Sequence, residues 1–290
     1  MADVSREVVA DGLGYLEAAR WHGGALWFSD IKHRTIHRMA AGGGLEAFAT
    51  VPARPSGLGF EPDGSVLVIS MEDSRLMRVR DGELEEVADL GPVSHHPNDM
   101  AVDREGRAYI SQFGFDLFGG GPPETTGLLV RHPDGRIEAG GEGLTFPNGV
   151  ALSQDGRTLV TAESFSAPRT RLTAFDVRDD GSLAGQRVFA EFGSPQEDVV
   201  DGICMDAEGA VWVGCPFAGE FRRVVEGGTV TDTIAIPTDG GNYCVDCVLG
   251  GEDLRTLYLL VADTDVVRLG NDWDSTARVE AVRVDVPGIE

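Results

Sequence analysis

The chain has 290 residues, of which 42% are hydrophobic, and this is enough to bury a large core. Its formal net charge is −24 and it has no basic stripe that could neutralise phosphates, so we expect it to bind neither nucleic acid nor an anionic membrane surface. Residues 1–12 carry several charges, and no part of the chain has 18 consecutive apolar residues. We therefore expect neither a secretory signal nor a transmembrane helix.

A repeated pattern runs along the chain and predicts its architecture. Each copy consists of a polar anchor residue, a short alternating segment, a turn that ends in glycine, and a second alternating segment. Clear copies occupy residues 56–68, 98–110, 148–160 and 201–213, and weaker copies begin at residue 17 and near residue 246. The anchors are 39 to 53 residues apart, which is the length of one four-stranded propeller blade.

Further hairpin patterns lie between these copies, for example at residues 76–84 and 172–183, where Asp-Gly separates two alternating segments. Each period therefore holds four strands. No segment has a helical period over 11 or more residues. The sequence predicts an all-β, six-bladed β-propeller with four-stranded blades, in which residues 1–290 form a single domain.

The anchors are candidates for a metal site because equivalent positions of a propeller converge on one axis. They are Glu17, Ser56, Asn98, Asn148, Asp201 and, approximately, Asp246. Converging carboxylate and amide oxygens would repel one another without a cation, and they suit calcium, magnesium or manganese. The anchors include neither Cys nor His, which argues against a dedicated zinc site. The alternative is that Asn-Gly and Asp-Gly only form turns here.

Several ordered motifs give the chain a family resemblance. They are Glu17-x-x-x-Trp21 with residues 26–31 (LWFSDI), residues 97–103 (PNDMAVD), 146–150 (FPNGV), 200–206 (VDGICMD) and 249–253 (LGGED). In this order they resemble the family of senescence-marker protein (regucalcin), gluconolactonase and luciferin-regenerating enzyme, over residues 11–290.

The resemblance implies a divalent metal on the axis, with Glu17, Asn148 and Asp201 as protein ligands. Calcium is the expected ion, and Mg²⁺, Mn²⁺ or Zn²⁺ are alternatives. The resemblance also implies that Asn98 contacts the substrate or a metal-bound water. Asp201 matches the acid proposed to act as general base, and family enzymes hydrolyse lactones, often sugar lactones.

Two positions depart from the family pattern. Ala19 stands where the family often has proline. His96 stands where sugar-lactone members carry arginine, whose rigid fork of donors suits polyol or carboxylate oxygens. Imidazole is smaller and can act as acid or base. We therefore predict a substrate other than a sugar-acid lactone.

The leading hypothesis is a metal-dependent lactonase or esterase-like hydrolase. Its predicted catalytic residues are Asp201, Asn98 and His96, and its predicted substrate-binding residues are Asn98, His96, Phe113 and Phe165. The two phenylalanines would form an apolar rim, although they could equally serve only to pack blades together. Two alternatives remain open: a metal-dependent isomerase or lyase using the same site, and a non-enzymatic binding propeller with a structural calcium.

The cysteines give an expectation about the compartment. Cys204 and Cys215 stand in apolar, strand-like surroundings, and the spacing of Cys244 and Cys247 lacks a second pair that would complete a zinc site. We therefore expect a reduced, cytoplasmic protein. Its expected partner is a small-molecule substrate, and the expected assembly is a monomer or weak homo-oligomer.

Overall fold

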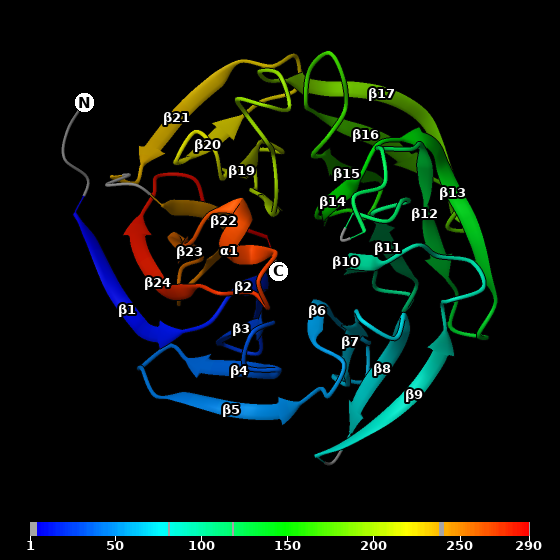
Figure 1. The fold of residues 1–290 in the computed structure, drawn as a ribbon, viewed down its shortest axis with the longest axis horizontal. Helices are drawn as coiled ribbons and strands as arrows, with labels where there is room; N and C mark the ends of the chain where they lie inside the picture. Colours follow the sequence, from blue (N-terminus) through cyan, green and yellow to red (C-terminus); the bar gives the residue numbers. More distant parts are fainter. Residues whose placement is uncertain (1–4, 81, 118, 238–240, 290) are drawn as a thin grey trace.

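The strands of the protein form six antiparallel four-stranded sheets around a common axis (Figure 1). The structure is a computed structural model that describes residues 5–80, 82–117, 119–237 and 241–289. Within these residues the only helix is α1 (Val266–Leu269), and no helix is long and apolar enough to cross a membrane. The predicted all-β, six-bladed propeller is confirmed.

Blades 1 to 3 follow one another along the chain, each with its first strand innermost. Blade 1 consists of β2 (Leu16–His22), β3 (Ala25–Asp30), β4 (Thr35–Ala40) and β5 (Leu45–Thr50). Blade 2 consists of β6 (Pro55–Phe60), β7 (Val66–Ser70), β8 (Arg75–Arg80) and β9 (Glu83–Asp89). Blade 3 consists of β10 (Pro97–Val102), β11 (Ala108–Gln112), β12 (Thr126–Arg131) and β13 (Ile137–Leu144).

Blades 4 and 5 repeat this order, and blade 6 combines both ends of the chain. Blade 4 consists of β14 (Pro147–Leu152), β15 (Thr158–Glu163), β16 (Arg171–Val177) and β17 (Leu183–Glu191). Blade 5 consists of β18 (Ile203–Met205), β19 (Val211–Cys215), β20 (Glu220–Val224) and β21 (Val230–Ala235). Blade 6 consists of β22 (Asn242–Gly250), β23 (Thr256–Asp263), β24 (Thr276–Arg283) and β1 (Arg6–Leu13).

The pairing of β1 with β24 closes the ring. β1 is the outermost strand of blade 6, with Arg6 opposite Val282 and Leu13 opposite Ala277. The chain therefore enters the ring by completing its last blade, and it covers the edge of β24 that would otherwise be unpaired. The sequence repeat did not predict this strand, because the repeat begins at the anchor of blade 1.

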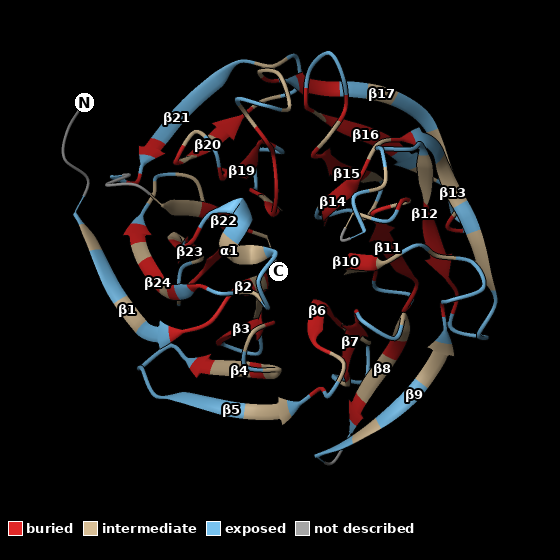
Figure 2. Ribbon diagram, in the orientation of Figure 1, coloured by how far each residue is buried: buried red, intermediate tan, exposed pale blue. Residues whose placement is uncertain are grey.

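Burial decreases from the axis outward (Figure 2). The second strands β3, β7, β11 and β19 are buried along their whole length, whereas the outer strands β5, β9 and β21 are largely exposed. The apolar clusters lie between facing blades: one joins blades 1 and 2, another blades 3 and 4, and others blades 4 with 5 and 5 with 6.

Candidate active site

The anchors of four consecutive blades are joined by side-chain hydrogen bonds. Ser56 Oγ donates to Asn98 Oδ1 (3.1 Å), and Asn98 Nδ2 donates to Asn148 Oδ1 (2.8 Å). Asn148 Nδ2 in turn donates to Asp201 Oδ1 (2.5 Å). All four side chains are buried. The repeat position thus brings together polar groups that are 42 to 53 residues apart in sequence.

Local irregularities in the inner strands accompany the anchors. In blades 1 to 4 the pairing of the inner strand with its neighbour shifts register beside the anchor, for example between Glu17 and Arg20 and between Pro147 and Val150. Blade 6 has a shift between Cys244 and Asp246. A β-bulge re-aims a side chain relative to a regular ladder. The shift in β22 accounts for the one-residue offset of the sixth repeat.

The glycines that follow two anchors, Ser56 and Asn148, lie where inner strands approach closely. A Cβ on Gly149 would lie 2.7 Å from the backbone of Asp201 and Ile203, and one on Gly57 would lie 2.7 Å from Asp99 Cα. Gly149 and Gly57 lie within β14 and β6. These Asn-Gly and Ser-Gly pairs are therefore strand residues selected for contact between blades, and not turns.

Glu17 on β2 contributes a further carboxylate to the same region. Burial raises the pKa of Glu17 well above its usual value, and the negative charges of Asp201, Asp246 and Asp99 raise it further. Burial likewise raises the pKa of Asp201, with Asp246 as the next cause, while the hydrogen bond from Asn148 opposes the shift. Glu17 is half-buried and Asp201 is buried, and two such carboxylates close enough to perturb each other create a strong demand for positive charge.

The donor set fits a hard cation. Among the described residues, no three His, Cys, Asp or Glu side chains form a metal cage, so a cation site here needs an amide oxygen as well as Glu17 and Asp201. Asn148 Oδ1 can supply it, because a carbonyl oxygen has two lone pairs and the hydrogen bond from Asn98 uses one. Oxygen donors of this kind suit calcium, magnesium or manganese.

A second polar layer lies next to these residues. Arg20 Nη2 contacts Asp99 Oδ1 at 2.5 Å and also donates to the Met100 carbonyl, so it bridges blades 1 and 3. Asp246 Oδ2 accepts from the Ala19 amide at 2.7 Å. Asp246 therefore ties blade 6 to blade 1, and it does not continue the hydrogen-bonded row of anchors.

His96 lies immediately before β10, two residues before Asn98. Its backbone is left-handed (φ 55°), and the residues before β6 and β14 share this feature. Its ring lies 5.7 Å from the rings of His95 and Phe113. Burial and then the charge of His95 lower the pKa of His96, so its imidazole is neutral at pH 7.

The two predicted rim phenylalanines belong to one aromatic cluster. Phe146 contacts both, with ring centroids 4.4 Å from Phe113 and 5.1 Å from Phe165. Phe113, Phe115 and Phe146 are buried, whereas Phe165 is half-buried. Packing therefore accounts for most of this cluster, and Phe165 keeps the more accessible surface.

Two residues of the site were not identified from the sequence. Ser164 Oγ accepts from Asn148 Nδ2 (3.1 Å) and donates to the Val200 carbonyl (2.7 Å), so it fixes the orientation of the Asn148 amide. Tyr15 lies two residues before Glu17, and the charges of Asp201 and Glu17 act on its phenol. Neither residue occupies an anchor position, so the repeat gave no signal for them.

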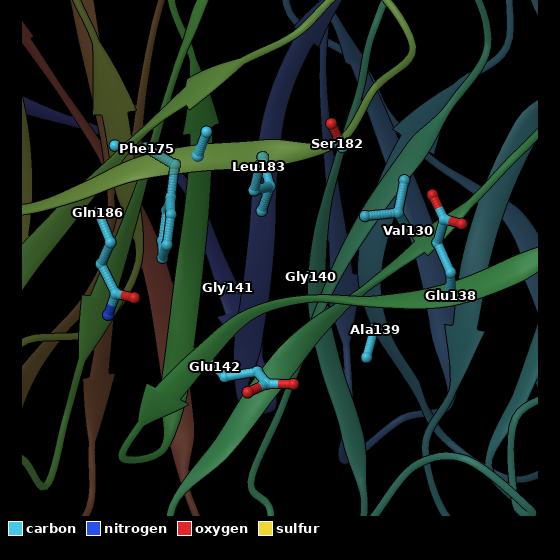
Figure 3. Close-up of a pocket in the computed structure, with 12 residues that line it drawn as sticks. Val130, Glu138, Ala139, Gly140, Gly141, Glu142, Phe175, Ser182, Leu183 and Gln186 are labelled. Carbon is cyan, nitrogen blue, oxygen red and sulfur yellow. The ribbon is translucent and has the colours of Figure 1, made fainter.

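The structure has two hollows that the anchor residues do not line. One, of about 910 Å³, is lined by the opposite ends of the inner strands, including Trp21, Phe60 and Met205. The other, of about 400 Å³, lies between the outer strands β13 and β17 beside Gly141 and Phe175 (Figure 3). Within the described part of the chain, no candidate site residue lines either hollow.

Comparison with known protein families identifies the family of the chain. The model of the SMP-30/Gluconolactonase/LRE-like region matches residues 16–263. The chain belongs to this family. It is 26% identical to pentonolactonase XacC of Haloferax volcanii over 264 residues, which covers 90% of this chain and 84% of the relative. It is 25% identical to a 6-deoxy-6-sulfogluconolactonase of Pseudomonas putida, covering 91% of this chain and 88% of the relative.

A solved structure shares the fold of this chain. A calcium-binding protein, regucalcin, from Agrobacterium tumefaciens has a TM-score of 0.73 at 20% identity, covering 96% of this chain and 94% of the other. The family resemblance inferred from the motifs is confirmed. The lactonase names of the family relatives also bear out the prediction of a hydrolase enzyme.

Proposed function

We propose that this protein is a divalent-metal-dependent lactonase whose cation is held by Glu17, Asn148 and Asp201. The observation that carries the proposal is the buried, hydrogen-bonded row Asn98–Asn148–Asp201, beside which the charge of Asp201 helps to raise the pKa of Glu17. Calcium is the favoured ion because the donors are two carboxylates and one amide oxygen. When bound, such a cation would supply Lewis-acid polarisation of the lactone carbonyl.

Asp201, Asn98 and His96 carry out the remaining steps of hydrolysis. Asp201 accepts a proton from the attacking water, whose oxygen forms a bond to the acyl carbon. The ring C–O bond breaks, the ring oxygen takes up a proton, and the product is a hydroxy acid. Asn98 orients the substrate through its amide, and neutral His96 can donate or accept a hydrogen bond at the same end of β10.

Two classes of lactone are candidate substrates. The relatives named above are lactonases of sugar-derived lactones by name, which favours a polyol ring. The prediction of a substrate other than a sugar-acid lactone rests on His96 and half-buried Phe165, and these relatives do not support it. A panel from aldonolactones to alkyl lactones distinguishes these two classes, since the ratio of kcat/KM values ranks them directly.

The test of the chemistry compares wild type with Asp201→Asn in metal-free protein and with added calcium, manganese or zinc. We expect acid release that requires metal and falls on the order of 10²-fold or more in the variant, since positioned acid–base groups contribute about that much. Asp155→Asn, a change in an exposed turn, is the matched control and should leave the rate unchanged. A wild type that opens no lactone with any of the metals contradicts the proposal.

A further inference from the structure

Two cysteine thiols from neighbouring blades are in contact. Cys204 Sγ on β18 lies 3.9 Å from Cys247 Sγ on β22, and one thiol donates a hydrogen bond to the other. The two residues are 43 apart in sequence, and both are free cysteines. The structure therefore gives Cys247 a sulfur neighbour that its spacing from Cys244 did not indicate.

The inner strands of blades 5 and 6 are held together next to these thiols. The Gly202 amide donates to the Val245 carbonyl at 2.9 Å, two residues before each cysteine. A Cβ on Gly202 would lie 2.1 Å from Asp246 Oδ1, so a larger residue there would push the strands apart. The Cys247 amide donates to the same carboxylate oxygen at 2.7 Å, which fixes the Cys247 backbone. The short distance between the two sulfurs therefore follows from how closely these blades approach.

The two thiols differ in their access to solvent. Cys204 is half-buried and lines the hollow of about 910 Å³ at the end of the inner strands opposite the anchors. Cys247 is fully buried in the apolar cluster between blades 5 and 6. Burial raises the pKa of the Cys247 thiol well above its usual value, so this thiol stays protonated at pH 7. A small oxidant that enters the hollow therefore meets Cys204 first.

We propose that Cys204 and Cys247 are a modification site, at which hydrogen peroxide forms a reversible disulfide between blades 5 and 6. The Cys204 sulfur attacks one peroxide oxygen, the O–O bond breaks, and a sulfenic acid and water result. The Cys247 sulfur then bonds to the Cys204 sulfur, and the sulfenic hydroxyl leaves as water with the Cys247 proton. The two sulfurs supply the two electrons that reduce the peroxide.

The disulfide closes a loop from β18 to β22, between residues that are 43 apart in sequence. Such a loop restricts the unfolded chain, which raises Tm. Cys204 follows Asp201 by three residues, so the cross-link also fixes the strand beside the candidate active site. The inference is independent of the proposed function, because the reaction uses neither a cation nor a lactone.

The test treats the folded wild-type protein with hydrogen peroxide and then blocks the remaining thiols with an alkylating reagent. We expect the number of free thiols to fall from four to two, and dithiothreitol to restore all four. Trypsin, which cleaves after arginine, should release residues 188–222 joined by a disulfide to residues 224–255. Tm should rise by about 5 °C on oxidation.

Two double variants distinguish this pair from the other cysteines. The Cys215→Ala/Cys244→Ala protein keeps only the proposed pair, and both of its thiols should be lost to the disulfide. The Cys204→Ala/Cys247→Ala protein is the matched control, because it loses the same number of sulfur atoms from the same strands β19 and β22 or from β18 beside them. It should keep both remaining thiols and show no rise in Tm.

The wild-type digest decides the question even where a variant fails to fold. Retention of all four thiols would overturn the inference, and so would oxidation of Cys204 to a sulfinic acid without a link. A linked protein whose Tm does not rise would also overturn it, because the disulfide would then form only by distorting the blades. A wild type that forms the disulfide but opens no lactone contradicts the proposed function alone.

Discussion

Under the proposed function, the side chain at position 96 lies two residues before Asn98, the residue proposed to orient the substrate. His96 is neutral at pH 7 because burial and His95 lower its pKa, and its ring lies beside that of Phe113. A neutral imidazole offers one donor and one acceptor, whereas arginine offers five donors and a permanent charge. The proposed function therefore predicts that the residue at this position determines how polar a substrate the site accepts.

Substitution of His96 by arginine tests this determinant. We expect His96→Arg to lower KM for aldonolactones about tenfold relative to alkyl lactones, because a guanidinium can bind ring hydroxyls with charge-assisted hydrogen bonds. The measurement is the ratio of kcat/KM values for one aldonolactone and one alkyl lactone of equal ring size. His132→Arg, a change in a histidine that pairs with Glu138 on the outer strand β13, is the control. An unchanged ratio would mean that position 96 does not contact the substrate.

At the scale of the strands, the sequence predicted the repeated part of each blade and missed what the repeat does not contain. The anchors and the glycine turns recur in sequence, so Glu17, Asn98, Asn148 and Asp201 could be grouped from their spacing alone. The outer strand β1 has no anchor, and its place in blade 6 depends on a contact between the two ends of the chain. This closure supports the expectation that residues 1–290 form one domain, which stays a prediction.

The residues that contact the anchors could not be predicted from the sequence for a similar reason. Ser164 reaches Asn148 through the packing of neighbouring segments, and this packing depends on three-dimensional distances that no repeat encodes. The pair Asn148-Gly149 is typical of a turn, but Gly149 lies within the strand β14. Close approach between blades, and not turn geometry, explains that glycine.

A methyl group at position 149 tests the close approach of β14 to blade 5. We expect Gly149→Ala to lower Tm by about 5 °C, because overpacking a well-packed interior costs about 1–3 kcal/mol. It should also weaken calcium binding, since the new Cβ would push against the Asp201 carbonyl. Gly42→Ala, where a Cβ meets nothing within 4 Å, is the matched control for both calorimetric measurements. Equal effects of the two substitutions would contradict the close contact.

At the scale of the whole molecule, the axis concentrates negative charge in a protein that already carries a formal charge of −24. Half-buried Glu17 and buried Asp201 and Asp246 all have raised pKa values, and Arg20 is paired with Asp99. Such an arrangement opposes folding unless the acids keep their protons or a cation joins them. The acids of the candidate site therefore lower the free energy of unfolding, and a bound metal can restore it.

This balance predicts how stability depends on pH. Burial raises the pKa of Asp246 to about 7, so between its usual value near 4 and about 7 the folded protein holds a proton that the unfolded chain has released. The free energy of unfolding therefore falls as pH rises through that window, and this contribution is lost in Asp246→Asn.

We expect metal-free wild type to lose Tm more steeply from pH 5 to pH 7.5 than the variant. Calcium should raise the wild-type Tm more at pH 7.5 than at pH 5, because only the ionised acids bind it. Calorimetry with chelator and with excess calcium measures both slopes, and a wild-type Tm that rises relative to the variant across this range would show that the axial acids are not held protonated by the fold.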